Sequence, residues 1–437
     1  MLTTVLGEDS MANSAMKAAW TFGIPFWGRS RRTRVGALVV LLAAGAVAAG
    51  QVGHDPSLWL EARELGSSQP LQSGAAAPGD ASDDECGWQP GFARPNLDGE
   101  SLALEFFDDG TGPALYAGGW FATASGVLVN GIARWDGSAW SALSGPSGTG
   151  VSGTGFEGWV DALAVYDDGS GPALYAGGYF DYAGGVWVSG VARWDGSAWS
   201  PLSGPSWAGV DGWIYALAVY DDGSGPALYA GGYFDTAGGV LVNNIARWDG
   251  SAWSALSGPS GTGVNVEVYA LAVYDDGSGP ALFAGGYIGT AGGVLVNNVA
   301  RWDGNGWSAL GSPPGAGGYD DIVSGMGVFD DGSGPALYVG GSFTTAGGVA
   351  VVGIARWDGS AWSAIGGAPG TGVNGGLTRA LASYDDGTGP ALFAGGDFFT
   401  VGEGFASSYL AAWRCDGILF SDGFDRGDTN LWSVTLP

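Results

Sequence analysis

Paired acidic residues recur along the chain in one fixed context. The tripeptide Asp-Asp-Gly begins at Asp108, Asp167, Asp221, Asp275, Asp330 and Asp385, and each copy continues with Ser or Thr, Gly and Pro. Adjacent carboxylates together with backbone carbonyls are ligands that suit calcium. The spacing does not match an EF-hand loop, however, and Asp and Gly are also favoured in tight hairpin turns. We therefore predict structural turns, with calcium as the alternative; its ligands would be Asp108, Asp109, Asp167, Asp168, Asp221, Asp222, Asp275 and Asp276.

A second motif, Arg-Trp-Asp-Gly, occurs five times, beginning at Arg134, Arg193, Arg247, Arg301 and Arg356. Fivefold use favours a structural role, because a catalytic group is needed only once. The tryptophan is expected to pack between neighbouring repeats, and the arginine is suited to pairing with a neighbouring carboxylate.

Nothing in the sequence identifies a catalytic residue. No nucleophile stands beside a base, and the only histidine, His54, lies in the N-terminal segment. Catalysis by two carboxylates, as in glycosidases, stays open, but no two acids are singled out for it. A zinc site would need four ligands, which one histidine and two cysteines do not supply. A non-catalytic protein without a cofactor, calcium apart, is therefore the favoured interpretation.

The repeats differ most in the loops that join one repeat to the next. These loops carry aromatic side chains that could stack on sugar rings or anchor a protein partner, and acidic side chains that could add hydrogen bonds. The alternative is packing at the edge of each repeat, with drift between the copies. The candidate ligand-binding residues are Trp159, Trp207, Asp211, Trp213, Tyr319, Asp320 and Asp321.

All of these motifs belong to one repeated unit of short strands. Successive Asp-Asp-Gly copies begin 59, 54, 54, 55 and 55 residues apart, which indicates six units. In the unit 215–258, the segments YALAVYDDG, GPALYAGGYF, NNIARWDG and SAWSALSG are predicted as four strands, named a to d, with turn signals between them. One such antiparallel sheet is too small to be stable alone, and radial stacking buries its faces. The predicted fold is therefore all-β, a six-bladed β-propeller of four-stranded antiparallel blades.

The sixth unit lacks a good strand d, because WRCDGILF replaces the usual RWDGSAWSAL. A candidate lies at the other end of the chain, where Trp88 precedes its Asp-Asp-Gly by 20 residues, close to the 22 residues for the strand-d tryptophan Trp199. We therefore expect the N-terminal strand to close the ring. Cys86 and Cys415 would then lie on the two sides of one turn, and a disulfide between them would replace the covalent link of the other blades.

The order of an apolar strand, Gly-Gly, an aromatic-Asp pair and Trp resembles the kelch repeat. The matching residues of the third unit are Leu228–Gly232, Trp248, Asp249 and Trp253. The Arg-Trp-Asp-Gly block and the DDGSGPAL turn depart from kelch and are closer to repeat proteins predicted to be secreted by bacteria. The resemblance covers residues 86–417 and implies the fold without implying an activity. Residues 420–433 are similar to C-terminal segments of exported bacterial proteins, which implies export.

Charge limits the classes of partner. The chain has 437 residues and a formal net charge of −28, from 15 Lys and Arg against 43 Asp and Glu. Such a surface repels phosphate backbones, so no nucleic acid is expected as a partner. The acidity suits a soluble protein outside the cell and would also attract cations.

The N-terminus has the features of an export signal. Residues 35–49 form an apolar run of 15 that follows four arginines, and Ala46 and Ala48 offer a cleavage pattern. The run is short for a membrane span, with an uncleaved anchor as the alternative. The predicted organisation is a signal peptide with its n-region at 1–50, a flexible linker at 51–85, the propeller at 86–417 and a C-terminal tail at 418–437.

Together these features predict an exported monomer that binds a glycan or a protein at the cell surface through its joining loops. The protein would be secreted or held at the cell surface, and it would contact a membrane only through an uncleaved N-terminal segment. The alternatives are a secreted carbohydrate-active enzyme that uses carboxylates, and a purely structural surface protein.

Overall fold

The structure is a computed structural model that describes residues 97–311, 321–365, 372–374, 376–385, 390–401, 405–406, 410–413 and 419–421. All of these residues belong to one of the two compact units of the chain, residues 38–437. Every named element within them is a β-strand, which confirms the all-β prediction.

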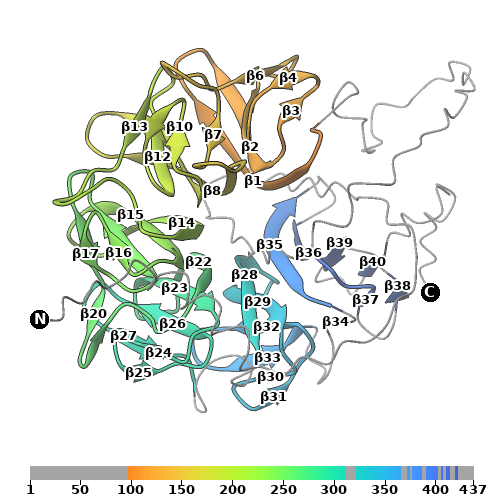
Figure 1. Cartoon of the computed structure of the whole chain (residues 1–437). Helices are drawn as coiled ribbons and strands as arrows, with labels where there is room; N and C mark the ends of the chain where they lie inside the picture. The colour runs from red at the N-terminus through yellow and green to blue at the C-terminus, as the bar shows by residue number, and fades with distance from the viewer. Residues whose placement is uncertain are drawn as a thin grey trace, which may run out of the picture. The chain divides into compact units, whose positions relative to one another are not determined.

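Six consecutive segments each form a four-stranded antiparallel sheet, and the sheets follow one another in chain order (Figure 1). The first sheet contains β1 (Glu100–Asp108), β2 (Pro113–Trp120), β5 (Ile132–Trp135) and β6 (Trp140–Ala142); the second contains β8 (Trp159–Asp167), β9 (Pro172–Tyr179), β12 (Val191–Trp194) and β13 (Trp199–Pro201). The third contains β14 (Trp213–Asp221), β15 (Pro226–Tyr233), β18 (Ile245–Trp248) and β19 (Trp253–Ala255); the fourth contains β22 (Val268–Asp275), β23 (Pro280–Gly286), β26 (Val299–Trp302) and β27 (Trp307–Ala309). The fifth contains β28 (Ile322–Asp330), β29 (Pro335–Ser342), β32 (Ile354–Trp357) and β33 (Trp362–Ala364); the sixth contains β35 (Thr378–Asp385), β36 (Pro390–Gly396), β39 (Leu410–Trp413) and β40 (Leu419–Ser421). The four strands of each sheet pair in the predicted order a to d.

A short hairpin joins strand b to strand c in each sheet. The hairpin strands are β3 (Thr123–Ala124) with β4 (Val127–Leu128), β10 (Tyr182–Ala183) with β11 (Val186–Trp187), β16 (Thr236–Ala237) with β17 (Val240–Leu241), β24 (Thr290–Ala291) with β25 (Val294–Leu295), β30 (Thr345–Ala346) with β31 (Val349–Ala350), and β37 (Thr400–Val401) with β38 (Phe405–Ala406). The loops from strand d to the next strand a add β7 (Val151–Ser152), β20 (Ser257–Gly258), β21 (Gly261–Thr262) and β34 (Val373–Asn374). Of these, β7 pairs with β10 and β34 pairs with β37, so the d–a loops are attached to the hairpins.

The Gly-Gly pair in strand b is required by close packing. A Cβ atom on Gly231 would lie 2.5 Å from Cγ1 of Val268 in the next sheet, and one on Gly232 would lie 1.9 Å from the backbone oxygen of Trp213. Both distances are shorter than carbon–carbon or carbon–oxygen contacts allow, so a larger residue would push the strands and sheets apart.

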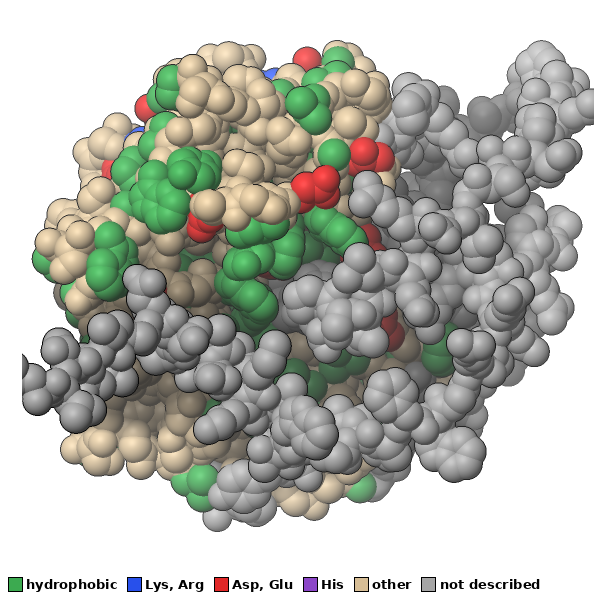
Figure 2. Space-filling view, in the orientation of Figure 1, with side chains coloured by type: hydrophobic (Ala, Val, Ile, Leu, Met, Phe, Trp, Pro, Cys, Tyr) green, Lys and Arg blue, Asp and Glu red, His purple; other side chains and the backbone are tan. Residues whose placement is uncertain are grey.

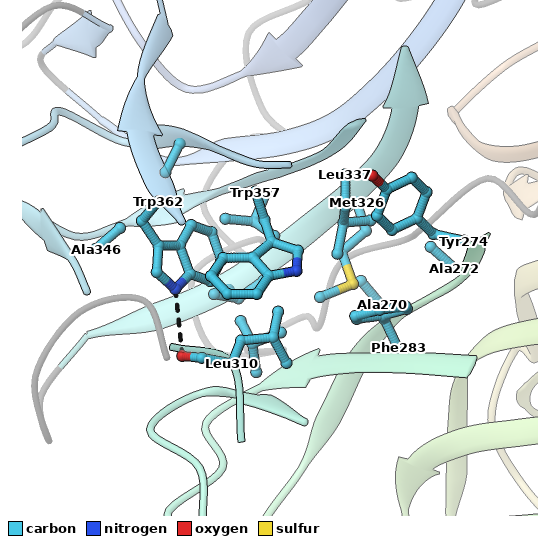
Figure 3. Close-up of a cluster of buried hydrophobic side chains, with 14 of the residues drawn as sticks. Ala270, Ala272, Tyr274, Phe283, Leu310, Met326, Leu337, Ala346, Trp357 and Trp362 are labelled. Carbon is cyan, nitrogen blue, oxygen red and sulfur yellow. Dashed lines mark hydrogen bonds between the residues drawn. The ribbon is translucent and has the colours of Figure 1, made fainter. Parts of the chain in front are cut away.

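The hydrophobic core lies between neighbouring sheets. One cluster of buried side chains joins the fourth sheet to the fifth, and Tyr274, Met326, Trp357 and Trp362 all pack in it (Figure 3). Trp362 also donates a hydrogen bond from Nε1 to the backbone oxygen of Leu310 at the end of the fourth sheet, 3.3 Å away. Other clusters join the first sheet to the second, the second to the third, the third to the fourth, and the fifth to the sixth. The prediction that the motif tryptophans pack between repeats is confirmed for Trp194, Trp248, Trp302 and Trp357, whereas Trp135 packs within the first sheet.

The sixth sheet corrects the prediction about its fourth strand. Residues Leu419–Ser421 pair with β39 as strand d, with Trp413 opposite Leu419, so the expectation that an N-terminal strand fills this position is wrong. Strand β40 carries no tryptophan, the residue by which the other strands d are recognised in the sequence. The sheet therefore extends past the predicted boundary at residue 417. Trp88, Cys86 and Cys415 lie outside the described residues, and the predicted disulfide stays a prediction.

Candidate functional site

Each sheet has two ends with different chemistry. The a–b and c–d turns lie at one end, which we call the turn end; the b–c hairpins and d–a loops lie at the other, the loop end. The loop end is tied together by backbone bridges, such as Val210 with Ala237, and by asparagine side chains. Asn244 donates a hydrogen bond to the backbone oxygen of Val264, 3.1 Å away, and accepts one from the N–H of Phe234, 3.2 Å away. The hairpin of the third sheet is thereby fixed to the loop that leads into the fourth.

At the turn end, the first aspartate of the Asp-Asp-Gly motif stabilises its own turn in the five repeats whose turn the structure describes. In the third sheet, Asp221 Oδ1 accepts hydrogen bonds from the backbone N–H groups of Gly223 at 2.9 Å and Gly225 at 3.0 Å. The same pattern occurs at Asp108, Asp167, Asp275 and Asp330. These carboxylates therefore act as turn-forming groups.

The second aspartate joins the turn to strands b and c. Asp222 accepts hydrogen bonds from Ser224 and from the hydroxyl of Tyr229, 2.9 Å away, and its Oδ2 lies 3.1 Å from Nε of Arg247. Burial alone would raise the pKa of Asp222, but the hydrogen bonds from Ser224 and Tyr229 and the charge of Arg247 lower it overall. The prediction that the motif arginine pairs with a carboxylate is confirmed.

The described Asp-Asp-Gly turns do not form a cluster of side chains that could coordinate calcium. Within the described part of the chain, no group of three or more His, Cys, Asp or Glu side chains is placed to hold a metal ion. The predicted ligands Asp108, Asp109, Asp167, Asp168, Asp221, Asp222, Asp275 and Asp276 instead have hydrogen bonds or ion pairs within their own repeats.

Large apolar side chains are exposed mainly at the loop end. The exposed large hydrophobic residues there are Trp120, Val127, Leu128, Trp187, Trp207, Tyr233, Leu241, Tyr287, Leu295 and Phe399, whereas Phe106 and Val219 lie within strands a. Hydrophobic side chains show in several groups on the side of the molecule seen in Figure 2, where basic side chains are scarce. Surface apolar residues concentrated in this way are typical of a binding surface.

Seven aromatic residues from the second, third and fourth sheets form one group at the loop end, which we call the aromatic cluster. Tyr179, at the end of β9, lies 4.8 Å from Trp159 and 4.8 Å from Trp213, measured between ring centroids. Tyr215 lies 6.2 Å from Trp213 and 5.2 Å from Tyr269 of the fourth sheet. The members of the cluster are Phe156, Trp159, Tyr179, Trp213, Tyr215, Tyr233 and Tyr269.

The d–a loop between the first and second sheets contributes one ring, Phe156, to the aromatic cluster. The 59-residue interval between Asp108 and Asp167 accommodates a longer d–a loop, whose Phe156 stacks on Tyr179 with a centroid distance of 4.4 Å and an interplanar angle of 15°. The loop is held by its backbone, because the N–H of Thr154 donates to Asp181 Oδ2 at 2.7 Å.

A buried acid lies beside the aromatic cluster. Asp161 is 1% exposed, and neither of its carboxylate oxygens has a hydrogen-bond partner. Burial raises the pKa of Asp161 well above its ordinary value, and interaction with the indole of Trp159 offsets this only in part. The pKa of the Tyr215 hydroxyl is also raised. Burial is the main cause, and the neighbouring Tyr269 and then the charge of Asp161 raise this pKa further.

The predicted ligand-binding residues do not lie together in the structure. Trp159 and Trp213 come together in the aromatic cluster, whereas Trp207 is exposed in a separate turn that its backbone oxygen closes with the N–H of Gly204 at 2.8 Å. Asp211 has a structural contact: its Oδ1 accepts the N–H groups of Asp235 and Thr236, 2.9 and 2.8 Å away. Asp321 is partly buried just before β28, and Tyr319 and Asp320 lie outside the described residues.

Most members of the aromatic cluster were not among the predicted site residues. Tyr179 and Tyr233 follow the Gly-Gly pair at the end of strand b, where the residue changes from aromatic in the first four sheets to Ser342 and Asp397 in the last two. That change between otherwise similar repeats was the available signal. Asp161 and Tyr215 were hidden because a β-bulge near the start of strand a breaks the alternation of side chains.

The geometry defines an all-β repeat protein with an aromatic surface at one end of its sheets. Comparison of the chain with family models, with curated proteins and with solved structures found no match. In the part of the chain that the structure describes, no helix has the length and hydrophobicity needed to cross a membrane.

Proposed function

We propose that this chain is an exported, six-bladed β-propeller that binds a neutral glycan through the aromatic cluster at its loop end. The observation that carries this proposal is the exposure of aromatic side chains at that end, around a group of rings contributed by three successive sheets. Flat rings with polar edges stack on the apolar faces of sugar rings, and tyrosine and tryptophan leave hydrogen-bonding groups for the hydroxyls.

Two features support the ring that a propeller requires. Six four-stranded sheets follow one another, with buried side chains packed between neighbours. Glu100 of the first sheet also interacts electrostatically with Arg379 and Asp397 of the sixth, as expected if the first and the last sheet are neighbours. This interaction supports closure of the ring by contact between the first and the sixth sheet.

The charges at the loop end favour a neutral ligand over an anionic one. Among the described residues, Arg379 is the only basic side chain there, and it is paired with Asp397 at 2.6 Å. The five motif arginines lie at the turn end in ion pairs with aspartates. Uronic acids, sulfates and phosphates would therefore meet acidic and aromatic groups without a cation to bind them.

Binding to purified oligosaccharides tests this proposal. The full chain without its signal would be titrated calorimetrically with neutral and uronic-acid oligosaccharides. We expect saturable binding to a neutral sugar, a loss of about tenfold or more in affinity for Trp213→Ala, and little change for the control Phe106→Ala, which removes an exposed ring from a strand. Binding restricted to acidic sugars, or no binding to any sugar, would contradict the proposal.

We also expect the bound glycan to remain intact. Glycoside hydrolysis needs one protonated and one ionised carboxyl group on either side of the scissile bond. Burial raises the pKa of Asp161, and no second acid among the described residues contributes to that shift, so Asp161 lacks the ionised partner that hydrolysis requires. Release of reducing ends from a bound oligosaccharide would instead support the carboxylate-dependent enzyme.

A further inference from the structure

One position of strand a differs between the repeats in a way that the fold does not require. The bulged residue near the start of this strand is Leu102, Asp161, Tyr215, Tyr269, Ser324 or Arg379 in the six sheets. In the second to fourth sheets the rest of the strand is identical, as DALAVYD, YALAVYD and YALAVYD show. Because residues of such different size and polarity occupy the bulge, the scaffold itself does not select the residue type.

The polar residues at this position have partners, with one exception. Ser324 donates a hydrogen bond to the backbone oxygen of Thr378, 2.7 Å away, and Arg379 forms an ion pair with Asp397. Tyr215 and Tyr269 pack on each other. Asp161 alone is buried with both oxygens unpaired.

An unpaired buried carboxyl group destabilises a folded protein. Leu102 shows that the first sheet accepts an apolar residue at the same place. The indole of Trp159 compensates the burial of Asp161 only in part, and hydroxyl groups of a ligand would supply the missing hydrogen bonds.

The neighbours of Asp161 indicate the chemistry of that ligand. The indole of Trp159 and the ring of Tyr215 both interact with the carboxyl group, and both belong to the aromatic cluster. A carboxyl group beside flat rings suits a pyranose that stacks on a ring and presents two adjacent hydroxyls at its edge. An alkylammonium ion fits less well, because Trp159, Tyr179 and Trp213 pack on each other at 4.8 Å and do not surround a common space.

We propose that Asp161 is the specificity-determining residue of the glycan site, and that it binds two adjacent hydroxyl groups of a neutral sugar stacked on the aromatic cluster. This inference rests on the proposed function. Since only 1% of Asp161 is exposed, the ligand reaches it when a neighbouring side chain turns away. Trp159 is half-buried and interacts with the carboxyl group, so rotation of its indole would give a ligand access to Asp161.

The test uses Asp161→Asn and Asp161→Leu in the full chain without its signal; the leucine variant copies the first sheet. Thermal unfolding and calorimetric titration with the neutral oligosaccharide bound by the unaltered protein would be measured for both. We expect both variants to unfold at a higher temperature near pH 7 and to bind at least about tenfold more weakly. The matched control is Asp235→Asn, an exposed acid at the loop end, which should change neither quantity.

The outcomes separate this inference from the function on which it rests. Unchanged affinity in both Asp161 variants would overturn the role of Asp161 while leaving glycan binding intact. Unfolding at a lower temperature in both variants would also overturn it, because Asp161 would then have a structural partner. Failure of the unaltered protein to bind any neutral sugar would remove the proposed function, and the role of Asp161 with it.

Discussion

At the scale of single residues, one repeat contains a natural variant of its turn network. In the fourth sheet Phe283 occupies the place of the tyrosine that hydrogen-bonds Asp222 in the third, and Arg301 there donates directly to Asp276 at 2.7 Å. The network therefore tolerates loss of the hydroxyl as long as the carboxylate and the guanidinium remain together.

This comparison predicts unequal effects from two substitutions in the third sheet. Asp222→Ala leaves the largely buried guanidinium of Arg247 and the hydroxyl of Tyr229 without their acceptor, and should lower the free energy of unfolding by about 3 kcal/mol. Tyr229→Phe, which copies the fourth sheet, should cost at most about 1 kcal/mol. Urea denaturation measures both, and equal losses would show that the carboxylate is not the centre of the network.

Glu105 predicts a pH-dependent stability. It occupies in β1 the position that Ala164 and Ala218 hold in the next two sheets, and burial raises its pKa to about 7, although the N–H of Phe106 partly offsets this. When folding raises the pKa of an acid, the free energy of unfolding is highest below the pKa of the unfolded state, here near 4.5. It falls as the pH rises toward 7, because the buried carboxyl group must then lose its proton. Glu105→Gln should therefore raise the unfolding temperature at pH 8 and leave it nearly unchanged at pH 4. A difference of the same size at both pH values would exclude titration as its cause.

Some of these residues could be predicted from the sequence and others could not. The Asp and Arg of the turn network recur together in five of the six repeats, so their pairing could be predicted from repetition. Asp161 could not be found in this way, because a bulge breaks the regular alternation and only the three-dimensional packing shows that its oxygens lack partners. Asp211, Asp320 and Asp321 were predicted to bind ligand because they lie in variable loops; Asp211 instead holds a backbone turn.

At the scale of elements, the tryptophans of strand d connect neighbouring sheets. Trp253 is buried against the second sheet and donates from Nε1 to the backbone oxygen of Leu202 at 3.2 Å. Trp253→Ala should lower the free energy of unfolding by about 3–5 kcal/mol through a cavity and a lost hydrogen bond. Trp253→Phe keeps most of the packing and should cost about half as much. Chemical denaturation would compare them, and a loss below about 1 kcal/mol for the alanine variant would argue against tight contact between the sheets.

The sixth sheet gives a second prediction about elements. A chain that ends after residue 421 keeps β40, whereas a chain that ends after residue 418 exposes the edge of β39. Loss of the three pairs between β39 and β40 should cost about 1–3 kcal/mol in unfolding experiments. Equal stability of the two chains would argue against β40 as strand d and would favour the N-terminal segment in that position.

The order of strands in the sheets was predictable, because four strand signals separated by Asp-Gly turns recur at a nearly constant interval. The exception had a local cause. Strand d of the sixth sheet lacks tryptophan, and its register joins Trp413 to Leu419, six residues on, whereas Trp302 joins Trp307, five residues on. The segment therefore matches the repeat in its backbone pairing and not in its sequence.

At the scale of the whole molecule, the described basic side chains are already paired with aspartates, and the surface is acidic. Binding of a neutral glycan through aromatic rings should therefore depend little on salt, because no counterions are exchanged. We expect the dissociation constant to change by less than about twofold between about 0.05 and 0.5 M NaCl. Calorimetric titration at both salt concentrations measures this, and a steep weakening with salt would indicate an ionic contact with the ligand.

The difference in charge between the two ends of the sheets would change the surface charge of a material that the protein covers. In the third repeat the turn end carries Asp221, Asp222 and Asp249 against the single cation Arg247, and the first, second, fourth and fifth repeats share this composition. Molecules attached to an uncharged polysaccharide by their loop ends would direct these aspartates into the medium. Particles covered in this way would acquire a negative zeta potential and repel one another, so the protein would act as a dispersant for a material that otherwise has no charge of its own.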